Sequence, residues 1–102
     1  METMITARHG EIADILRTRA ERVLERLARL ATRPTTAHVT FGIEHQRATA
    51  EVRLTAARGA VHVATAEAAD HRTALDRAAA KLRRQLDKLD PNPRRRAGSA
   101  GR

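Results

Sequence analysis

The residues best suited to bind a ligand are arginines and lysines that recur three or four positions apart in two stretches of the chain. Such spacing places side chains on one face of a helix. The cations are Arg22, Arg26 and Arg29 in residues 11–31 and Arg77, Lys81, Arg84 and Lys88 in residues 70–89. Arginine can hold a phosphate with two parallel hydrogen bonds. The spacing therefore predicts a surface for a polyanion, or alternatively a solvated face that Asp76 and Asp87 partly neutralise.

No other pattern in the sequence carries a recognisable reaction. It contains no glycine-rich phosphate loop, no nucleophile elbow and no paired metal-binding histidine motif. The five histidines are scattered, and although His38 and His62 could face each other across strands, a third ligand is missing. We therefore predict a binding protein rather than an enzyme, with no metal, no cofactor and no small-molecule substrate.

Composition indicates a polyanionic partner, either nucleic acid or an anionic membrane surface. The 102 residues fit one domain with a net charge of +8, and residues 91–102 supply four arginines to that total. The only aromatic residue is Phe41, so structured RNA, recognised by shape and backbone, fits better than stacking on unpaired bases.

Membranes and the secretory route are disfavoured as settings for this protein. The sequence has no apolar stretch near the roughly 20 residues that span a bilayer, and the helices lack Trp and Phe for a membrane surface. Cysteine and a secretory signal are also absent from the sequence. We predict a cytoplasmic protein without a membrane partner.

Two long helices are predicted, at residues 11–31 and 70–89, because apolar residues recur at helical spacing. The first buried stripe is Ile12, Leu16, Val23, Leu27 and Leu30, flanked by Ile15, Ala20 and Leu24; the second is Leu75, Ala79, Leu82, Leu86 and Leu89, widened by Ala78. Asp70 is suited to cap the second helix, and Pro91 prevents its continuation. The first helix has no obvious cap, since Ala13 stands where Ser or Thr would help.

Strands are predicted at residues 1–7, 36–44, 49–55 and 60–66, where apolar and polar residues alternate. The element order β-α-β-β-β-α predicts an α+β fold in which a four-stranded sheet carries both helices on one face. The other face would present to water the side chains of His38, Thr40, Glu51, Arg53 and His62. Residues 1–90 would form the domain, and residues 91–102 a disordered basic tail.

Several segments of residues 1–90 match a known pattern in their order and spacing. They are ITARH (5–9) with Glu11 and Ile12, RVLERL (22–27), EHQRATAEV (44–52), ATAE (64–67), Asp70, ALD (74–76) and KLRRQL (81–86). Together they resemble the ribosome hibernation-promoting factors, also called ribosome-associated inhibitors or sigma-54 modulation proteins. The fold of that family has the element order given above. Its members bind the small ribosomal subunit in the mRNA and tRNA channel and keep idle ribosomes inactive.

The resemblance implies a stress-related inhibitor of translation whose partners are the small ribosomal subunit and its 16S rRNA. Carried over by motif position, the implied rRNA-binding residues are Arg8, Arg22, Lys81, Arg84 and Lys88, to which helical geometry adds Arg26, Arg29 and Arg77. The cations on the two predicted helices could form one broad patch. Arg72 departs from the family, which often has a tyrosine there. The stretch after Leu89 is short, whereas long family members carry a second domain there.

Two other functions remain open from the residues. One is a general structured-RNA-binding or regulatory module with no preference for ribosomes. The other is a protein-interaction module that uses the open sheet face or an edge strand. The sequence makes no prediction of self-association.

Overall fold

The computed structural model describes residues 1–89, with side chains for residues 1–88, and its elements follow the predicted order. They are β1 (Glu2–Ala7), α1 (Asp14–Ala28), β2 (Thr36–Glu44), β3 (Arg47–Thr55), the 3-10 turn η1 (Ala57–Gly59), β4 (Val61–Ala68) and α2 (His71–Leu89). The predicted tail, residues 91–102, and the side chain of Leu89 lie outside the described residues.

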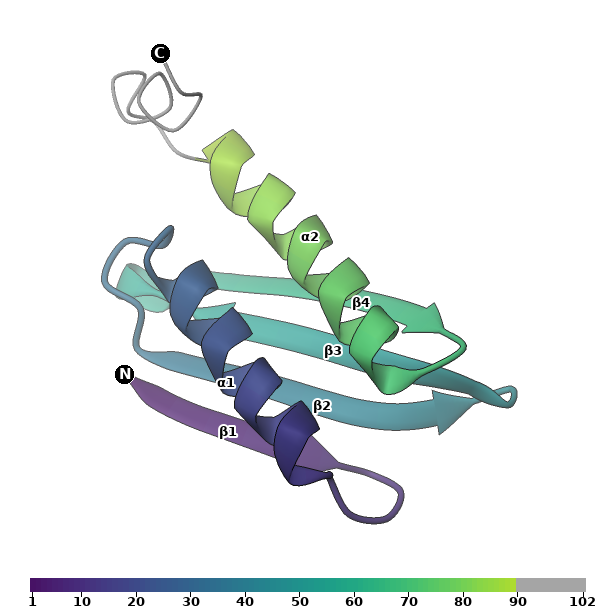
Figure 1. The fold of residues 1–102 in the computed structure, drawn as a ribbon. Helices are drawn as coiled ribbons and strands as arrows, with labels where there is room; N and C mark the ends of the chain where they lie inside the picture. Colours follow the sequence, from purple (N-terminus) through teal and green to yellow (C-terminus); the bar gives the residue numbers. More distant parts are fainter. Residues whose placement is uncertain (90–102) are drawn as a thin grey trace.

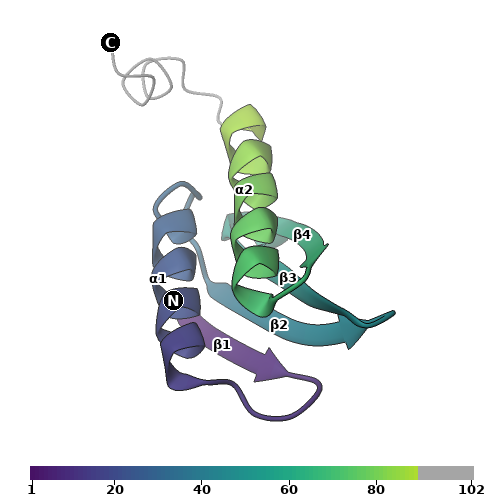
Figure 2. The same cartoon turned by 45° about the vertical axis from the view of Figure 1, so that its right-hand side comes forward.

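The four strands form one sheet in the order β1-β2-β3-β4 (Figure 1). The first two strands are parallel, which requires the crossover that α1 provides, and the other neighbours are antiparallel. Both helices cover the same face, α1 over β1 and β2 and α2 over β3 and β4 (Figure 2). The predicted α+β fold is confirmed.

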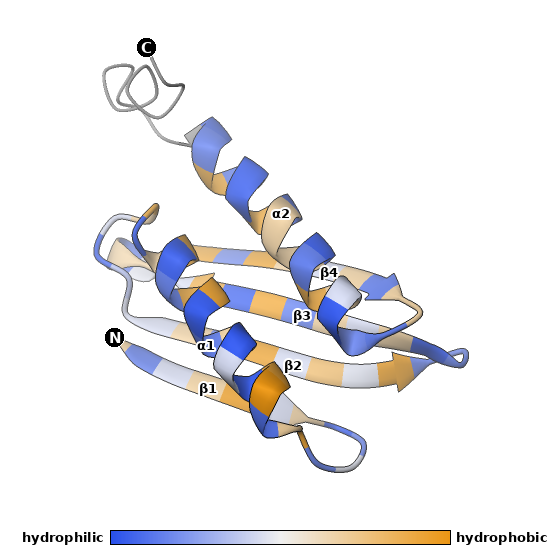
Figure 3. Cartoon of the chain, in the orientation of Figure 1, coloured by the Kyte–Doolittle hydropathy of each residue, from blue (hydrophilic) through white to orange (hydrophobic). Residues whose placement is uncertain are grey.

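The core is a single apolar layer between the sheet and the two helices. The strands alternate in hydropathy along their length (Figure 3). The inward side chains of the two central strands are Ala37, Val39 and Phe41 of β2 and Ala50, Val52 and Leu54 of β3, and they pack in one cluster with Leu24 and Leu27 of α1 and Leu75, Leu82 and Leu86 of α2. Burying a side chain the size of Val or Leu contributes about 1.5–3 kcal/mol, so this layer dominates the stability of the fold.

The edge strand β4 presents alanines rather than valines to the helices. The prediction that His62 lies on the open face of the sheet was wrong. His62 pairs with the buried Leu54, so it lies on the helix-covered side and is half-buried. Val63 pairs with Arg53 and lies on the open face. The physical reason is close packing: small inward side chains on β4 let α2, which carries the buried Ala78, approach the strand.

Helix α1 is shorter than predicted, and one residue of its expected buried margin lies outside the core. Ile15 is 83% exposed, whereas Ala20 and Leu24 are buried. Ala13 occupies the N-cap position and makes no side-chain hydrogen bond, because it has no hydroxyl to offer the first turn. The helix therefore begins at Asp14 rather than at residue 11.

Hydrogen bonds hold the start of α2, some within its first turn and one to strand β2. Asp70 caps the helix as predicted, since its Oδ1 accepts the backbone N–H of Thr73 at 2.8 Å and its Oδ2 accepts the Thr73 hydroxyl at 3.0 Å. These bonds, the backbone one foremost, lower the pKa of the Asp70 carboxyl. His71 Nε2 donates to the Gly42 carbonyl at 2.8 Å, and its ring meets that of Phe41 edge-on. The helix start is thereby held against β2.

The hairpin between β2 and β3 turns on two residues with left-handed backbone conformations. His45 has φ of 51° and Gln46 has φ of 65°. Two consecutive positive φ values are typical of a type I′ turn, which matches the twist of the flanking strands. The tight turn extends β3 to Arg47, two residues before the predicted start.

Candidate nucleic-acid interface

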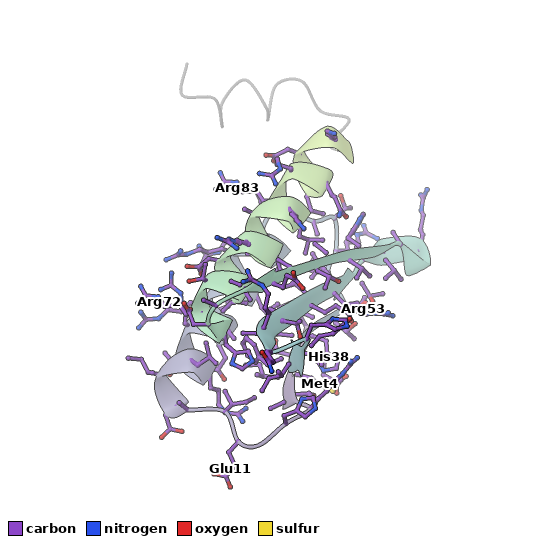
Figure 4. The ribbon with its side chains drawn as sticks, turned by 90° about the vertical axis from the view of Figure 1, so that its right-hand side faces the viewer. Met4, Glu11, His38, Arg53, Arg72 and Arg83 are labelled. Carbon is purple, nitrogen blue, oxygen red and sulfur yellow. The ribbon has the colours of Figure 1, made fainter. Side chains whose placement is uncertain are left out.

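A groove of about 1090 Å³ runs between the two helices and is lined mainly by arginines and apolar side chains. We call it the interhelical groove; its arginines are Arg19, Arg22 and Arg26 of α1 and Arg72 and Arg83 of α2. Figure 4 shows Arg72 and Arg83 on the same side of α2. The apolar lining includes Leu16, Val23 and Ala79. An anion in this groove would meet cations from both helices.

One ion pair ties the helices together across the groove. Arg19 binds Asp76 with two parallel hydrogen bonds, Nε to Oδ1 at 3.0 Å and Nη2 to Oδ2 at 2.8 Å. The hydrogen bond to Asp76 raises the pKa of Arg19. The two side chains are 39% and 43% exposed, so solvent screening limits the contribution of the pair to at most about 1 kcal/mol. The pair connects the two helices across the groove.

The predicted cations of α2 lie on the other side of that helix, over the outer edge of β4. Arg77 Nη1 donates to the Glu67 carbonyl at 3.1 Å, and Lys81 Nζ donates to the Thr65 carbonyl at 2.9 Å. Gln85 Nε2 continues the series with the Val63 carbonyl at 3.0 Å. We call these three donors, Arg77, Lys81 and Gln85, the β4-edge row. Their helical spacing continues to Arg84 and Lys88, which are exposed.

The structure therefore separates the predicted binding residues into groups and does not bring the two rows together. Arg22 and Arg26 line the interhelical groove, whereas Arg77 and Lys81 reach the far edge of the sheet. Arg29 is exposed at the C-cap of α1. Arg8 follows β1, and its side chain passes Gly42, where an added Cβ would lie 3.6 Å from the Arg8 Cδ.

Sequence reasoning missed Arg19, Arg72 and Arg83 as groove residues. Of the three, only Arg72 was considered from the sequence, as a departure from the family pattern. Arg19 and Asp76 are 57 residues apart in the sequence. Their proximity depends on which faces of the two helices meet, and helical spacing within each helix does not determine that. The one usable signal was that Arg72, Asp76 and Arg83 share a helix face distinct from that of Arg77.

Charge is segregated between the two layers of the molecule. The two helices carry ten lysines and arginines against five aspartates and glutamates, whereas the four strands carry two against four. The strand charges lie on the open face, which also presents Met4, His38 and Arg53 on the side away from Arg72 and Arg83 (Figure 4). A polyanion is therefore attracted to the helix layer rather than to the open sheet face.

Within residues 1–89, no group of three or more His, Asp or Glu side chains is placed to hold a metal ion. His38 and His62 lie on opposite faces of the sheet, because their strand partners Arg53 and Leu54 do. No helix in the same range is long and apolar enough to cross a membrane.

Residues 1–89 thus form an α+β domain with a basic helix layer. The chain matches the model of the family described as Sigma 54 modulation protein / S30EA ribosomal protein over residues 3–91, and it belongs to that family. Members of this family are ribosome-associated proteins, as the sequence resemblance predicted. No curated protein sequence matches the chain.

Two solved structures share this fold. A ribosomal subunit interface protein from Coxiella burnetii superimposes with a TM-score of 0.76 at 23% identity, covering 90% of this chain and 100% of that one. The N-terminal domain of Protein Y from Thermus thermophilus gives a TM-score of 0.73 at 28% identity, covering 87% of this chain and 99% of that one.

Proposed function

We propose that this protein is a hibernation factor that inhibits translation by occupying the mRNA and tRNA channel of the small ribosomal subunit. The observation that carries the proposal is the basic helix layer on a fold whose relatives are ribosome-associated. The mechanism is steric, because a domain seated in the channel excludes mRNA and tRNA without a chemical step. The site of action would be cytoplasmic, where ribosomes translate.

The proposed partner of the helix layer is 16S rRNA. The residues that would contact its phosphates are Arg8, Arg22, Arg26, Arg29, Arg77, Lys81, Arg84 and Lys88. The hydrogen bonds to β4 still allow Arg77 and Lys81, the cations of the β4-edge row, to contact phosphates. A lysine ammonium has three donors and an arginine guanidinium has five, and one donor each is engaged by the strand carbonyls. Anchoring at β4 also holds these long side chains in place, which lowers the entropy lost on binding.

Co-sedimentation with purified small subunits and whole ribosomes tests the proposal. We expect stoichiometric pelleting that survives an excess of tRNA and weakens steeply with salt, because each phosphate contact releases counterions. The variant Lys81→Glu/Arg84→Glu/Lys88→Glu should no longer pellet although it remains folded. The matched control is Arg17→Glu/Arg53→Glu/Arg58→Glu, which makes the same change in net charge at exposed positions outside the proposed set.

Two outcomes would contradict the proposal. Pelleting of the folded triple variant at the wild-type level would remove the β4 side of α2 from the interface. Complete loss of wild-type pelleting on addition of tRNA would instead indicate a general structured-RNA-binding module.

A further inference from the structure

The far end of the interhelical groove is lined by positively charged side chains from both helices. The two helices run in the same general direction (Figures 1 and 2). Arg19 meets Asp76 across the groove, and seven residues further along each helix stand Arg26 and Arg83, which both line the groove. Seven residues are nearly two turns, about 10.5 Å, so the same helix faces recur. At the level where the groove should repeat an ion pair, it therefore has two guanidinium groups.

Among the described residues, no carboxylate lines this end of the groove. The acids that line the groove are Asp14, Asp70 and Asp76, all in the first two turns or at the cap of their helices. Asp70 is engaged by Thr73 and Asp76 by Arg19. The ion pairs found among residues 1–88 involve neither Arg26 nor Arg83. Like charges on the two helices repel each other, and a bound anion would reduce that repulsion.

We infer that the interhelical groove is a binding site for a single RNA sugar–phosphate strand, with one phosphate held between Arg26 and Arg83 and others along the strand held by Arg22 and Arg72. The inference rests on the proposed function, which it extends by naming a second contact surface and two residues outside the predicted set. Guanidinium groups approaching one phosphate from two sides can each form paired hydrogen bonds with it. The Arg19–Asp76 pair spans the groove about two helical turns before this point.

The lining of the groove suits an extended sugar–phosphate strand. Arg72 and Arg83 are eleven residues apart, about 16 Å along the helix, so the cations extend over more than one phosphate of an RNA strand. Leu16, Val23 and Ala79 along the groove offer apolar contact. The groove has no aromatic side chain among its lining residues, so we expect recognition of the backbone and not of particular bases.

Reversing one charge gives a test that separates this site from general attraction to a basic protein. In Arg83→Glu the new carboxylate would face Arg26, so the variant should bind a ten-residue oligouridylate at least tenfold more weakly and yet melt about 2–4 °C higher. The slope of log affinity against log salt should fall by about 0.7 for each phosphate contact that the variant no longer makes. Arg26→Glu should behave alike, and the double reversal should lose the gain in melting temperature.

The control is Arg17→Glu, which makes the same charge change on a part of α1 that does not line the groove. We expect it to weaken oligouridylate binding less than threefold. Equal losses in Arg17→Glu and Arg83→Glu, or a lower melting temperature in both single reversals at positions 26 and 83, would overturn the inference.

Competitors identify the source of the phosphate. An abasic ten-residue oligomer should displace labelled oligouridylate as well as the unlabelled form does, whereas tripolyphosphate and a ten-residue polyglutamate peptide should compete poorly. Strong competition by tripolyphosphate would refute a strand in favour of a free polyphosphate, and strong competition by polyglutamate would point to an acidic protein segment. These assays contain no ribosomes, so a failure of ribosome pelleting would count against the proposed function alone.

Discussion

The hairpin turn between β2 and β3 allows a sharp test of how the backbone limits stability. Left-handed backbone conformations cost a non-glycine residue roughly 1 kcal/mol. Both turn residues adopt them, His45 at φ 51° and Gln46 at φ 65°. Asn followed by Gly is the pair that type I′ turns favour. The change to make is therefore His45→Asn/Gln46→Gly.

The expected gain is the difference between relieved strain and added freedom of the unfolded chain. Gln46→Gly removes about 1 kcal/mol of strain but costs about 0.5 kcal/mol in unfolded-state entropy. His45→Asn adds about 0.5 kcal/mol, since Asn tolerates this region better. It also removes the approach of His45 Nδ1 to Glu44 Oε1 at 3.9 Å, but these side chains are 89% and 69% exposed, so their interaction contributes little. We expect the double variant to be about 1 kcal/mol more stable and to melt about 4–8 °C higher.

Thermal and urea unfolding followed by far-ultraviolet circular dichroism would measure the change, because the chain has no Trp or Tyr for fluorescence. The control is Gln46→Ala, which removes the side chain and keeps the strained backbone. If the double variant were no more stable than Gln46→Ala, the strain would not lie in this turn and the reasoning would be refuted.

Three further changes test other parts of the structure. Asp70→Ala should destabilise α2. Because hydrogen bonding lowers the folded-state pKa of Asp70, the stabilisation by Asp70 is present above its unfolded-state pKa and disappears as the pH falls through the folded-state pKa. The difference in unfolding free energy between wild type and Asp70→Ala, measured with urea, should therefore become smaller in acid. Asp76→Ala should lower the melting temperature by a few degrees by freeing Arg19, with a smaller effect in high salt, where surface charges are screened; an effect independent of salt would contradict the ion pair. Gly42→Ala would place a Cβ 2.9 Å from Thr49 Oγ1 and should cost about 1 kcal/mol, which the additional change Thr49→Ala should largely restore in thermal unfolding.

The fold was predictable because its signals are local. The residue alternation in β2 predicted the bounds of that strand, Thr36–Glu44, and the carboxylate of Asp70 marked the start of α2. The face of β4 was not predictable, because both Val63 and Ala64 are apolar and only the approach of α2 decides which side needs the smaller residue.

The candidate interface was less predictable, because it depends on how separate helices meet. Helical spacing correctly grouped Arg77 with Lys81, which share the β4 side of α2. It gave no information on which face of α2 is turned towards α1. The groove arginines Arg72 and Arg83 could therefore be recognised only from the structure, in which the Arg19–Asp76 contact shows which helix faces meet.

The β4-edge row has a consequence for assembly. Successive donors on α2 are four residues apart, about 6.0 Å of helix rise, and the carbonyls they meet are two residues apart, about 6.6 Å of strand. Because the two spacings are nearly equal, three successive contacts can form: from Arg77 to Gln85 the helix rise and the strand rise differ by only about 1.2 Å. Side chains of the helix thus hydrogen-bond the outer carbonyls of Glu67, Thr65 and Val63. A strand from another molecule finds these acceptors occupied at β4, so growth of the sheet by strand addition is directed to β1 at its opposite end.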